Sequence, residues 1–286
     1  MDIPLEQYRV FYHAAKTLNF SEAAKQLFVS QSAVSQSISK LEKKLGCQLF
    51  IRSSKKVYLT SDGVMLFEYL EQAFNSIRCA EKSIEIRKNP YEGELRIAST
   101  DTLCKYYLLP KIKSLICKYP KMKFNIMNRT SFACLELLEK ASVDLAIVNL
   151  SSIINRNYVV EKSYDFTDVF VVNQDMKSQW PQEITFEDLA SHTLLMLDEK
   201  TVSRQFYDDL FMEKGIIPDI EVQSVDLLIE MAKAGLGLAF IPDFCAYANE
   251  DLFILNLKGL PTRRYGLITL KQTLLTPMGK VFLDAF

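Results

Sequence analysis

The sequence predicts an α+β multidomain protein with a small helical N-terminal unit, one long helix and a larger α/β body. Three observations predict this organisation. Apolar residues recur at helical spacing up to Gly46, no proline interrupts residues 62–89, and from Glu94 onward strand-like apolar runs alternate with helical stretches. The chain has 286 residues, of which 49% are hydrophobic, so it is large enough to bury separate cores.

The charge is unevenly distributed along the chain. Residues 1–62 hold nine Lys/Arg against five Asp/Glu, whereas the remaining residues hold 25 Lys/Arg against 30 Asp/Glu. A basic N-terminal unit on a mildly acidic body suits a small module that faces nucleic acid, although chance clustering gives the same balance.

The cysteines and the N-terminus indicate the compartment. Six cysteines without CxxC spacing favour reduced thiols over disulfides, and neither a metal site nor a cofactor is expected. The N-terminus has no signal-peptide pattern, and no apolar run approaches the length of a membrane span. We therefore expect a cytoplasmic protein that does not bind a membrane.

Three short helices are predicted before Gly46. Residues 5–18 form the first, Ser21 is expected to cap the second, and Ser30 is expected to cap a third that ends at Gly46. The apolar stripe of the third helix comprises Ala33, Val34, Ile38, Leu41 and Leu45. Two helices crossing at a tight turn predict a helix-turn-helix.

Polar side chains face away from that stripe, and they are Gln31, Ser32, Ser35 and Gln36. Their short amide and hydroxyl groups suit base edges and phosphates in the major groove of DNA, although a solvated surface has the same composition. Residues 47–59 then predict two short strands around a basic tip. In this wing, Arg52, Lys55 and Lys56 are expected to lie along phosphates.

The long helix follows, with Thr60 or Ser61 as its expected cap. Its apolar residues step by three and four positions and are Phe67, Leu70, Phe74, Ile77 and Ile84, with Glu81 on the remaining seam position. This spacing predicts a coiled-coil-like seam that pairs with the same helix of a second subunit. Packing along its own chain is the alternative.

Several fragments of this region resemble the LysR-type transcriptional regulators. They are Phe20-Ser-Glu-Ala-Ala, Ser30-Gln-Ser-Ala-Val-Ser, Leu41-Glu, Leu45-Gly, Leu49-Phe-Ile-Arg52 and Leu59-Thr-Ser-Asp-Gly63. The resemblance implies a winged helix-turn-helix DNA-binding domain in residues 1–60, a linker and dimerisation helix in 61–91 and an effector-binding domain in 92–286. It also implies a homodimer or a tetramer built as a dimer of dimers, inverted-repeat promoter DNA as the binding partner, and contact with RNA polymerase.

The body has the alternation of an open α/β sheet. Strands are predicted at 95–98, 123–127, 145–148, 169–172, 193–196, 220–223, 237–241 and 265–270. Helices are predicted near 103–118, 131–141, 203–214, 225–234 and 276–286.

Motifs in the body extend the resemblance, namely Gly93-Glu-Leu-Arg-Ile97, Leu108-Leu-Pro110, Val143-Asp-Leu-Ala-Ile147 and Ala234-Gly-Leu-Gly-Leu-Ala-Phe-Ile-Pro242. The body of this family resembles type 2 periplasmic binding proteins, with two α/β lobes around a ligand cleft. The resemblance therefore implies a two-lobed C-terminal α/β effector domain. Lobe one is expected at 92–164 and 268–286, and lobe two at 165–267.

Polar clusters at predicted strand ends mark the expected effector cleft, because ligands of open α/β sheets collect there beside helix N-termini. The candidate residues are Ser99, Thr100, Thr102, Thr130, Asn149, Thr201 and Ser203. Each hydroxyl is equally suited to cap a helix. Thr100 and Thr102 match positions where sulfur-metabolism regulators of the family contact an anion, which implies a small anionic effector, although Asp101 adds a negative charge between them.

The sequence contains no catalytic pattern. His13 and His192 lie far apart without a nucleophile or carboxylate pattern, and the chain has no GxSxG, Walker, HExxH or GxGxxG motif. We therefore expect no enzymatic activity. A solute-binding protein would share the fold of the body, but the N-terminal unit and the lack of a signal peptide favour a transcriptional regulator that responds to a small-molecule effector.

Overall fold

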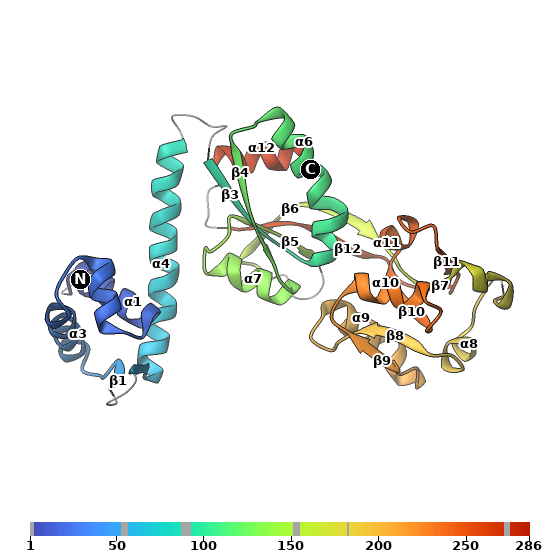
Figure 1. Cartoon of the computed structure of the whole chain (residues 1–286), viewed down its shortest axis with the longest axis horizontal. Coiled ribbons are helices and arrows are strands. Elements are labelled where there is room, and N and C mark those ends of the chain that lie inside the picture. Colours follow the sequence, from blue (N-terminus) through green and yellow to red (C-terminus); the bar gives the residue numbers. More distant parts are fainter. Residues whose placement is uncertain (1–2, 53–56, 87–92, 151–154, 182, 272–274) are drawn as a thin grey trace. The chain divides into compact units, whose positions relative to one another are not determined.

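The structure is a computed structural model that describes residues 3–52, 57–86, 93–150, 155–181, 183–271 and 275–286. Two compact units are present: unit 1 comprises residues 1–82 and unit 2 comprises residues 83–286 (Figure 1). Each is considered by itself. The division into domains at residues 60 and 91 stays a prediction.

Unit 1 consists of α1 (Leu5–Thr17), α2 (Phe20–Leu27), α3 (Gln31–Leu45), β1 (Phe50–Arg52), β2 (Val57–Leu59) and α4 (Ser61–Ile86). The cap of α2 differs from the expectation, because the side chain of Asn19, not of Ser21, accepts hydrogen bonds from the first backbone N–H groups. Ser30 caps α3 and Gly46 ends it, as predicted. The Thr60 hydroxyl accepts a 3.0 Å hydrogen bond from the Gly63 N–H, so Thr60 caps α4.

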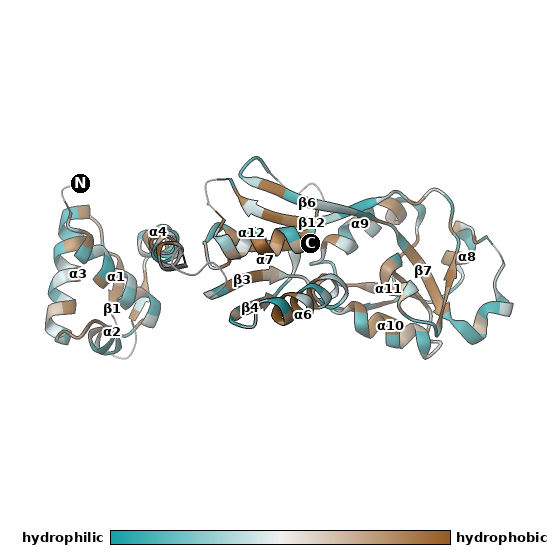
Figure 2. Cartoon of the chain, turned by 90° about the horizontal axis from the view of Figure 1, so that it is seen from above, coloured by the Kyte–Doolittle hydropathy of each residue, from teal (hydrophilic) through white to brown (hydrophobic). Residues whose placement is uncertain are grey.

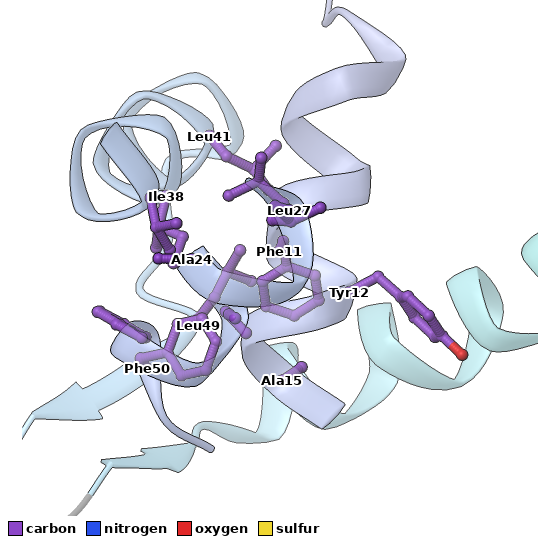
Figure 3. Packing of buried hydrophobic residues seen from close by; sticks show 14 of the residues in the cluster. Phe11, Tyr12, Ala15, Ala24, Leu27, Ile38, Leu41, Leu49 and Phe50 are labelled. Atoms are coloured by element: carbon purple, nitrogen blue, oxygen red, sulfur yellow. The ribbon is translucent and has the colours of Figure 1, made fainter. Parts of the chain in front are cut away.

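The core of unit 1 lies between α1, α2, α3 and the wing (Figure 3). Val34, Ile38 and Leu41 are completely buried, which confirms the middle of the predicted apolar stripe of α3. Its two end members, Ala33 and Leu45, are exposed, because the first and last turns of α3 extend beyond the core. The ring of Phe50 brings β1 into the same cluster, with its centroid 5.4 Å from that of Phe11. α3 therefore presents its polar face outward on a rigid base.

The long helix α4 packs on the unit that precedes it. The Tyr12 ring points away from the three-helix core toward α4 (Figure 3), and its centroid lies 5.5 Å from that of Phe67 and 5.0 Å from that of Phe74. Leu70 is buried in the same cluster. These residues therefore pack on α1 within the chain, as the alternative interpretation has it, although Phe67 and Phe74 are only partly buried. Pairing of α4 with a second subunit stays a prediction. Ile77 and Ile84 remain exposed.

Unit 2 contains two five-stranded sheets, with the strand orders β4-β3-β5-β12-β6 and β11-β7-β10-β8-β9. The first comprises β3 (Gly93–Ser99), β4 (Met122–Asn128), β5 (Leu145–Asn149), β6 (Tyr158–Phe166) and β12 (Arg263–Leu270). The second comprises β7 (Asp168–Asn173), β8 (Leu194–Leu197), β9 (Ile220–Val222), β10 (Leu238–Pro242) and β11 (Leu252–Leu255). Every predicted strand is present, and the structure adds β6 and β11.

Helices connect these strands. They are α5 (Asp101–Leu103), the π-helical turn η1 (Cys104–Leu108), α6 (Leu109–Lys118), α7 (Ser131–Glu139), η2 (Gln174–Gln179), α8 (Phe186–Ala190), α9 (Val202–Phe211), η3 (Met212–Lys214), α10 (Val225–Lys233), α11 (Asp243–Tyr247) and α12 (Pro277–Ala285). The central strands are apolar, as the brown colour of β7 shows (Figure 2). This is the composition expected of strands covered on both faces.

Each sheet with its helices forms one lobe: lobe one is built on the β3 sheet and lobe two on the β7 sheet. The chain crosses between them from β6 to β7 and returns at the start of β12. Arg263 already pairs with Phe166 in the lobe-one sheet, so β12 enters lobe one before residue 268.

A buried ion pair joins the two crossing points. Nη1 of Arg263 donates to the Asp168 carboxylate at 2.6 Å, and the side chains are only 7% and 1% exposed. The guanidinium carbon lies 5.1 Å and 4.4 Å from the ring centroids of Phe166 and Phe206. This contact couples the strand that leaves lobe one to the strand that returns to it.

No helix in the described part of the chain is long and apolar enough to cross a membrane.

Candidate functional site

The first turns of α3 form an exposed polar surface on unit 1. Gln31, Ser32 and Gln36 are exposed, and Ser35 is partly exposed, as the helical spacing predicts. The Ser32 hydroxyl lies 2.9 Å from that of Ser30, which accepts a hydrogen bond from the N–H of Ala33. This surface therefore presents amide and hydroxyl groups beside the capped N-terminus of α3.

The wing of unit 1 is an antiparallel pair of strands in which Arg52 lies opposite Val57. The backbone thus places Arg52 at the last paired position before the tip. The side chain of Arg52 lies outside the described part of the structure, and so do the predicted phosphate contacts Lys55 and Lys56. Their role in DNA binding stays a prediction.

A cavity of about 360 Å³ lies between the two lobes of unit 2. Its lining includes six of the seven candidate effector residues, which are Thr100, Thr102, Thr130, Asn149, Thr201 and Ser203. These residues come from β5 and from the starts of helical segments in both lobes. Residues selected because they follow predicted strand ends therefore line one cavity, although they lie up to about a hundred positions apart in the chain.

Ser99 is the exception among the candidates and requires a correction. It does not line the cavity, because β3 continues through this residue and buries its side chain completely. Its hydroxyl donates to the carbonyl oxygen of Thr100 at 3.1 Å. Because the C-terminal end of β3 lies one residue later than predicted, Ser99 is a core residue of the strand.

The hydroxyl groups at the helix starts that line the cavity differ in whether they cap their own helix. Thr130 and Thr201 are working helix caps, since they accept hydrogen bonds from the N–H groups of Ala133 and Arg204. Thr100 and Ser224 also stand at cap positions but make no side-chain cap bond. Each lobe therefore has at least one cap-position hydroxyl that is not committed to its own helix.

Other residues of the lining were not predicted. In lobe two they include Asp198 after β8, Gln223 and Ser224 after β9, and Pro242 with Phe244 after β10. All of them lie at or just beyond the carboxyl ends of strands, with Pro242 as the last residue of β10. The rule that selected the lobe-one loops would have found them if it had been applied to every strand of lobe two.

The ionised side chains of the lining balance one another. Asp101 and Asp198 oppose Arg129 and Lys200, and the Asp101 carboxylate accepts a 2.6 Å hydrogen bond from the amide of Asn128. The charged side chains thus give the cavity no net charge, and an anion would have to be attracted by backbone N–H groups. The N-termini of α7, α9 and α10 all border the cavity.

Beside the cavity, η1 of lobe one reaches lobe two. The Lys105 ammonium donates to the Asp226 carboxylate at 2.8 Å, and this hydrogen bond raises the pKa of Lys105. The rings of Tyr107 and Phe244 lie 4.8 Å apart. These contacts join the two lobes beside Phe244, which lines the cavity.

The reactive residue types have ordinary surroundings. Nδ1 of His13 lies 3.0 Å from the amide oxygen of Gln26, and the ring of His192 lies 4.4 Å from that of Trp180. Burial raises the pKa of the Cys134 thiol to about 12, so this thiol is protonated at neutral pH. Among the described residues, no group of three or more His, Cys, Asp or Glu is arranged to hold a metal ion.

Two family models match the chain. The model described as a bacterial regulatory helix-turn-helix protein of the lysR family matches residues 5–64, and the LysR substrate binding domain matches residues 88–286. The first match covers α1 to the start of α4, and the second covers both lobes and the cavity between them.

Individual proteins agree with these matches. The RuBisCO operon transcriptional regulator of Allochromatium vinosum is 28% identical over 92% of this chain and 88% of its own length. A full-length OxyR variant from Pseudomonas aeruginosa superposes with a TM-score of 0.71 at 20% identity, covering 100% of this chain and 95% of that chain. Full-length CbnR in complex with its target DNA gives a TM-score of 0.56 at 18% identity, covering 99% and 98%. The chain therefore belongs to the LysR family and is a LysR-type transcriptional regulator with a helix-turn-helix DNA-binding domain and an effector-binding domain.

Proposed function

We propose that this regulator binds inverted-repeat promoter DNA and responds to a small anionic metabolite held between its lobes. The observation behind the proposal is that one chain combines an exposed polar face on α3 with a cavity lined by both lobes of unit 2. Ligand would bind one relative arrangement of the lobes better than another and so shift the regulator between two states. The helix-turn-helix match and the relatives that are transcriptional regulators favour this role over that of an enzyme.

On DNA, Gln31, Ser32, Ser35 and Gln36 are proposed to contact base edges, while Arg52, Lys55 and Lys56 hold phosphates. Glutamine can form two hydrogen bonds with adenine, and a good pair of this kind is worth about 1–3 kcal/mol of discrimination. A lysine or arginine on a phosphate strengthens binding to every sequence alike and adds about one unit to the salt dependence of affinity.

Fluorescence anisotropy with a selected site and a scrambled duplex tests this division. We expect Gln36→Ala to lose affinity for the selected site only, and Arg52→Ala to lose affinity for both duplexes with a smaller salt slope. Equal losses on both duplexes in both variants would refute the division of roles. A parent chain that binds neither duplex at low salt would refute DNA binding itself.

The effector is proposed to be an anion because helix N-termini from both lobes border the cavity while its charged side chains cancel. Thr100 on lobe one and Ser224 on lobe two supply the uncommitted hydroxyls. A thermal-shift screen of sulfate, phosphate and small mono- and dicarboxylates tests the class, since a ligand at 100 times its Kd stabilises the folded chain by about 2.7 kcal/mol. Stabilisation by neutral or cationic metabolites alone would refute an anionic effector.

The regulator is proposed to act as a homodimer or a dimer of dimers. Within unit 1, α4 displays the exposed apolar side chains of Met65, Tyr69 and Ile77. Such a stripe is suited to pair with the same helix of a second subunit. We expect Tyr69→Asp with Ile77→Asp to dissociate the pair in sedimentation experiments, and Glu68→Gln to leave it intact. An unchanged sedimentation coefficient in the double variant would place the interface elsewhere.

A cytoplasmic location and contact with RNA polymerase complete the proposal. Both follow from regulation at a promoter. Co-purification of the polymerase with the regulator on a promoter fragment, and its loss when the bound site is scrambled, would test the second of these partners.

A further inference from the structure

Phe28 is the most exposed large apolar residue in the described part of the chain, with 95% of its surface open to solvent. It ends α2 in the left-handed conformation, with φ at 56°. The Phe28 N–H donates to the carbonyl of Lys25, and the Val29 N–H donates to that of Ala24. This is the Schellman pattern, in which glycine or asparagine is usual at the left-handed position because a bulky side chain strains it.

The chain itself gains almost nothing from this ring. Phe28 is absent from the apolar cluster of unit 1, to which its neighbour Leu27 belongs. A strained backbone and an exposed aromatic ring both favour the unfolded state. The Phe28 ring therefore does not stabilise unit 1, and we infer that it contacts a binding partner.

The position of the ring indicates what that partner is. Phe28 and the half-exposed Val29 lead directly into Ser30, Gln31 and Ser32, the cap and exposed first turn of α3. One turn earlier, Lys25 is exposed on α2. The ring is thus continuous with the surface proposed to face DNA.

Size argues against a protein partner at this point. One phenylalanine buries about 150–250 Å², whereas a stable protein interface needs about 1,000 Å² or more. Within a DNA interface already held by polar contacts, one ring is enough to add apolar contact with thymine methyl groups and deoxyribose. A basic unit, with nine Lys/Arg among residues 1–62, also favours DNA over a second copy of the chain.

We propose that Phe28 is a DNA-contacting residue that packs its ring on thymine methyl and deoxyribose groups at the edge of the groove entered by α3. The inference rests on the proposed DNA binding and adds a contact outside the predicted set. It differs from the phosphate contacts in kind, because burying an apolar ring releases no counterions.

Phe28→Asn in the full-length chain tests the proposal, because asparagine suits the left-handed position and keeps the end of α2 intact. We expect unchanged or higher thermal stability, an affinity for the selected duplex lower by about tenfold, and an unchanged salt slope. Phe28→Tyr, which keeps the ring, should bind nearly as well as the parent. Leu18→Asn is a matched stability control, since Leu18 ends α1 with φ at 48° in the same conformation.

The outcomes distinguish failure of the Phe28 contact from failure of DNA binding itself. If Phe28→Asn binds the duplex as tightly as the parent, the ring does not contact DNA and the inference is overturned, while DNA binding stands. A change in oligomeric state without a change in DNA affinity would also overturn it. If the parent binds no duplex, the proposed function fails first.

Discussion

Two residues at the starts of helices in lobe two, Thr201 and Ser224, differ in one contact and should therefore respond differently to loss of their hydroxyls. The Thr201 hydroxyl accepts from the N–H of Arg204 and donates to the carbonyl of Asp198, both at 3.1 Å. Ser224 makes no side-chain cap bond. We expect Thr201→Val to lower the free energy of unfolding and Ser224→Ala to leave it nearly unchanged.

The magnitudes follow from these contacts. Removing a working N-cap costs about 0.5–2 kcal/mol, typically about 1. Thr201→Val also removes the bond to Asp198, and Arg204 is a buried residue whose N–H gains little replacement from water. We therefore expect a loss of about 1–2 kcal/mol. With a urea m-value of about 2 kcal/mol/M, the unfolding midpoint should fall by about 0.5–1 M. Ser224→Ala should stay within about 0.5 kcal/mol of the parent.

Trp180 makes the assay selective, because it is the only tryptophan of the chain and lies in lobe two. Its fluorescence during urea unfolding therefore reports on the lobe that contains both substitutions. Thr201→Ser keeps the hydroxyl and serves as the control. Equal midpoint shifts in Thr201→Val and Ser224→Ala, or no shift in either, would refute the division of the cavity hydroxyls into caps and uncommitted groups.

Three further outcomes are expected. Arg263→Met should cost about 3–5 kcal/mol in urea unfolding by leaving the buried Asp168 without its partner, and adding Asp168→Asn should recover part of that loss; no recovery would contradict the pairing. Cys134 has its pKa raised from 9.0 to about 12 by burial, so the unfolded chain releases this proton first and stability should fall as pH rises from about 9 toward 12, by up to about 1.4 kcal/mol per pH unit. Cys134→Ala should flatten that slope, and an unchanged slope would mean that other groups cause it. Tyr12→Ala should destabilise unit 1 by about 3–5 kcal/mol in thermal melts, because the ring packs on α4 within the chain. Parent-like melting would contradict a stabilising role for this packing.

Much of the fold could be predicted because local chemistry decides it. Ser30 and Gly46 bound α3 as predicted, since a hydroxyl cap and a left-handed glycine act within a few residues of their own helix. The apolar stripe that contains Ile38 and Leu41 faces inward because helical periodicity places both residues on one side. Every strand predicted from an apolar run is present, whereas β6 was missed because its polar residues, among them Glu161 and Lys162, hide the strand pattern.

Tertiary structure decided what covers each apolar face and what each polar group does. Periodicity marked Phe67 and Phe74 as an apolar stripe, but it could not tell that Tyr12 of the same chain would cover them. Composition marked Thr100 and Thr201 alike as possible caps, yet only the structure shows that the Thr201 hydroxyl bonds to its own helix while that of Thr100 makes no cap bond. The physical reason is that a periodic pattern specifies only the face of its own helix or strand on which a side chain lies. The residue that packs against that side chain depends on how segments distant in sequence pack together.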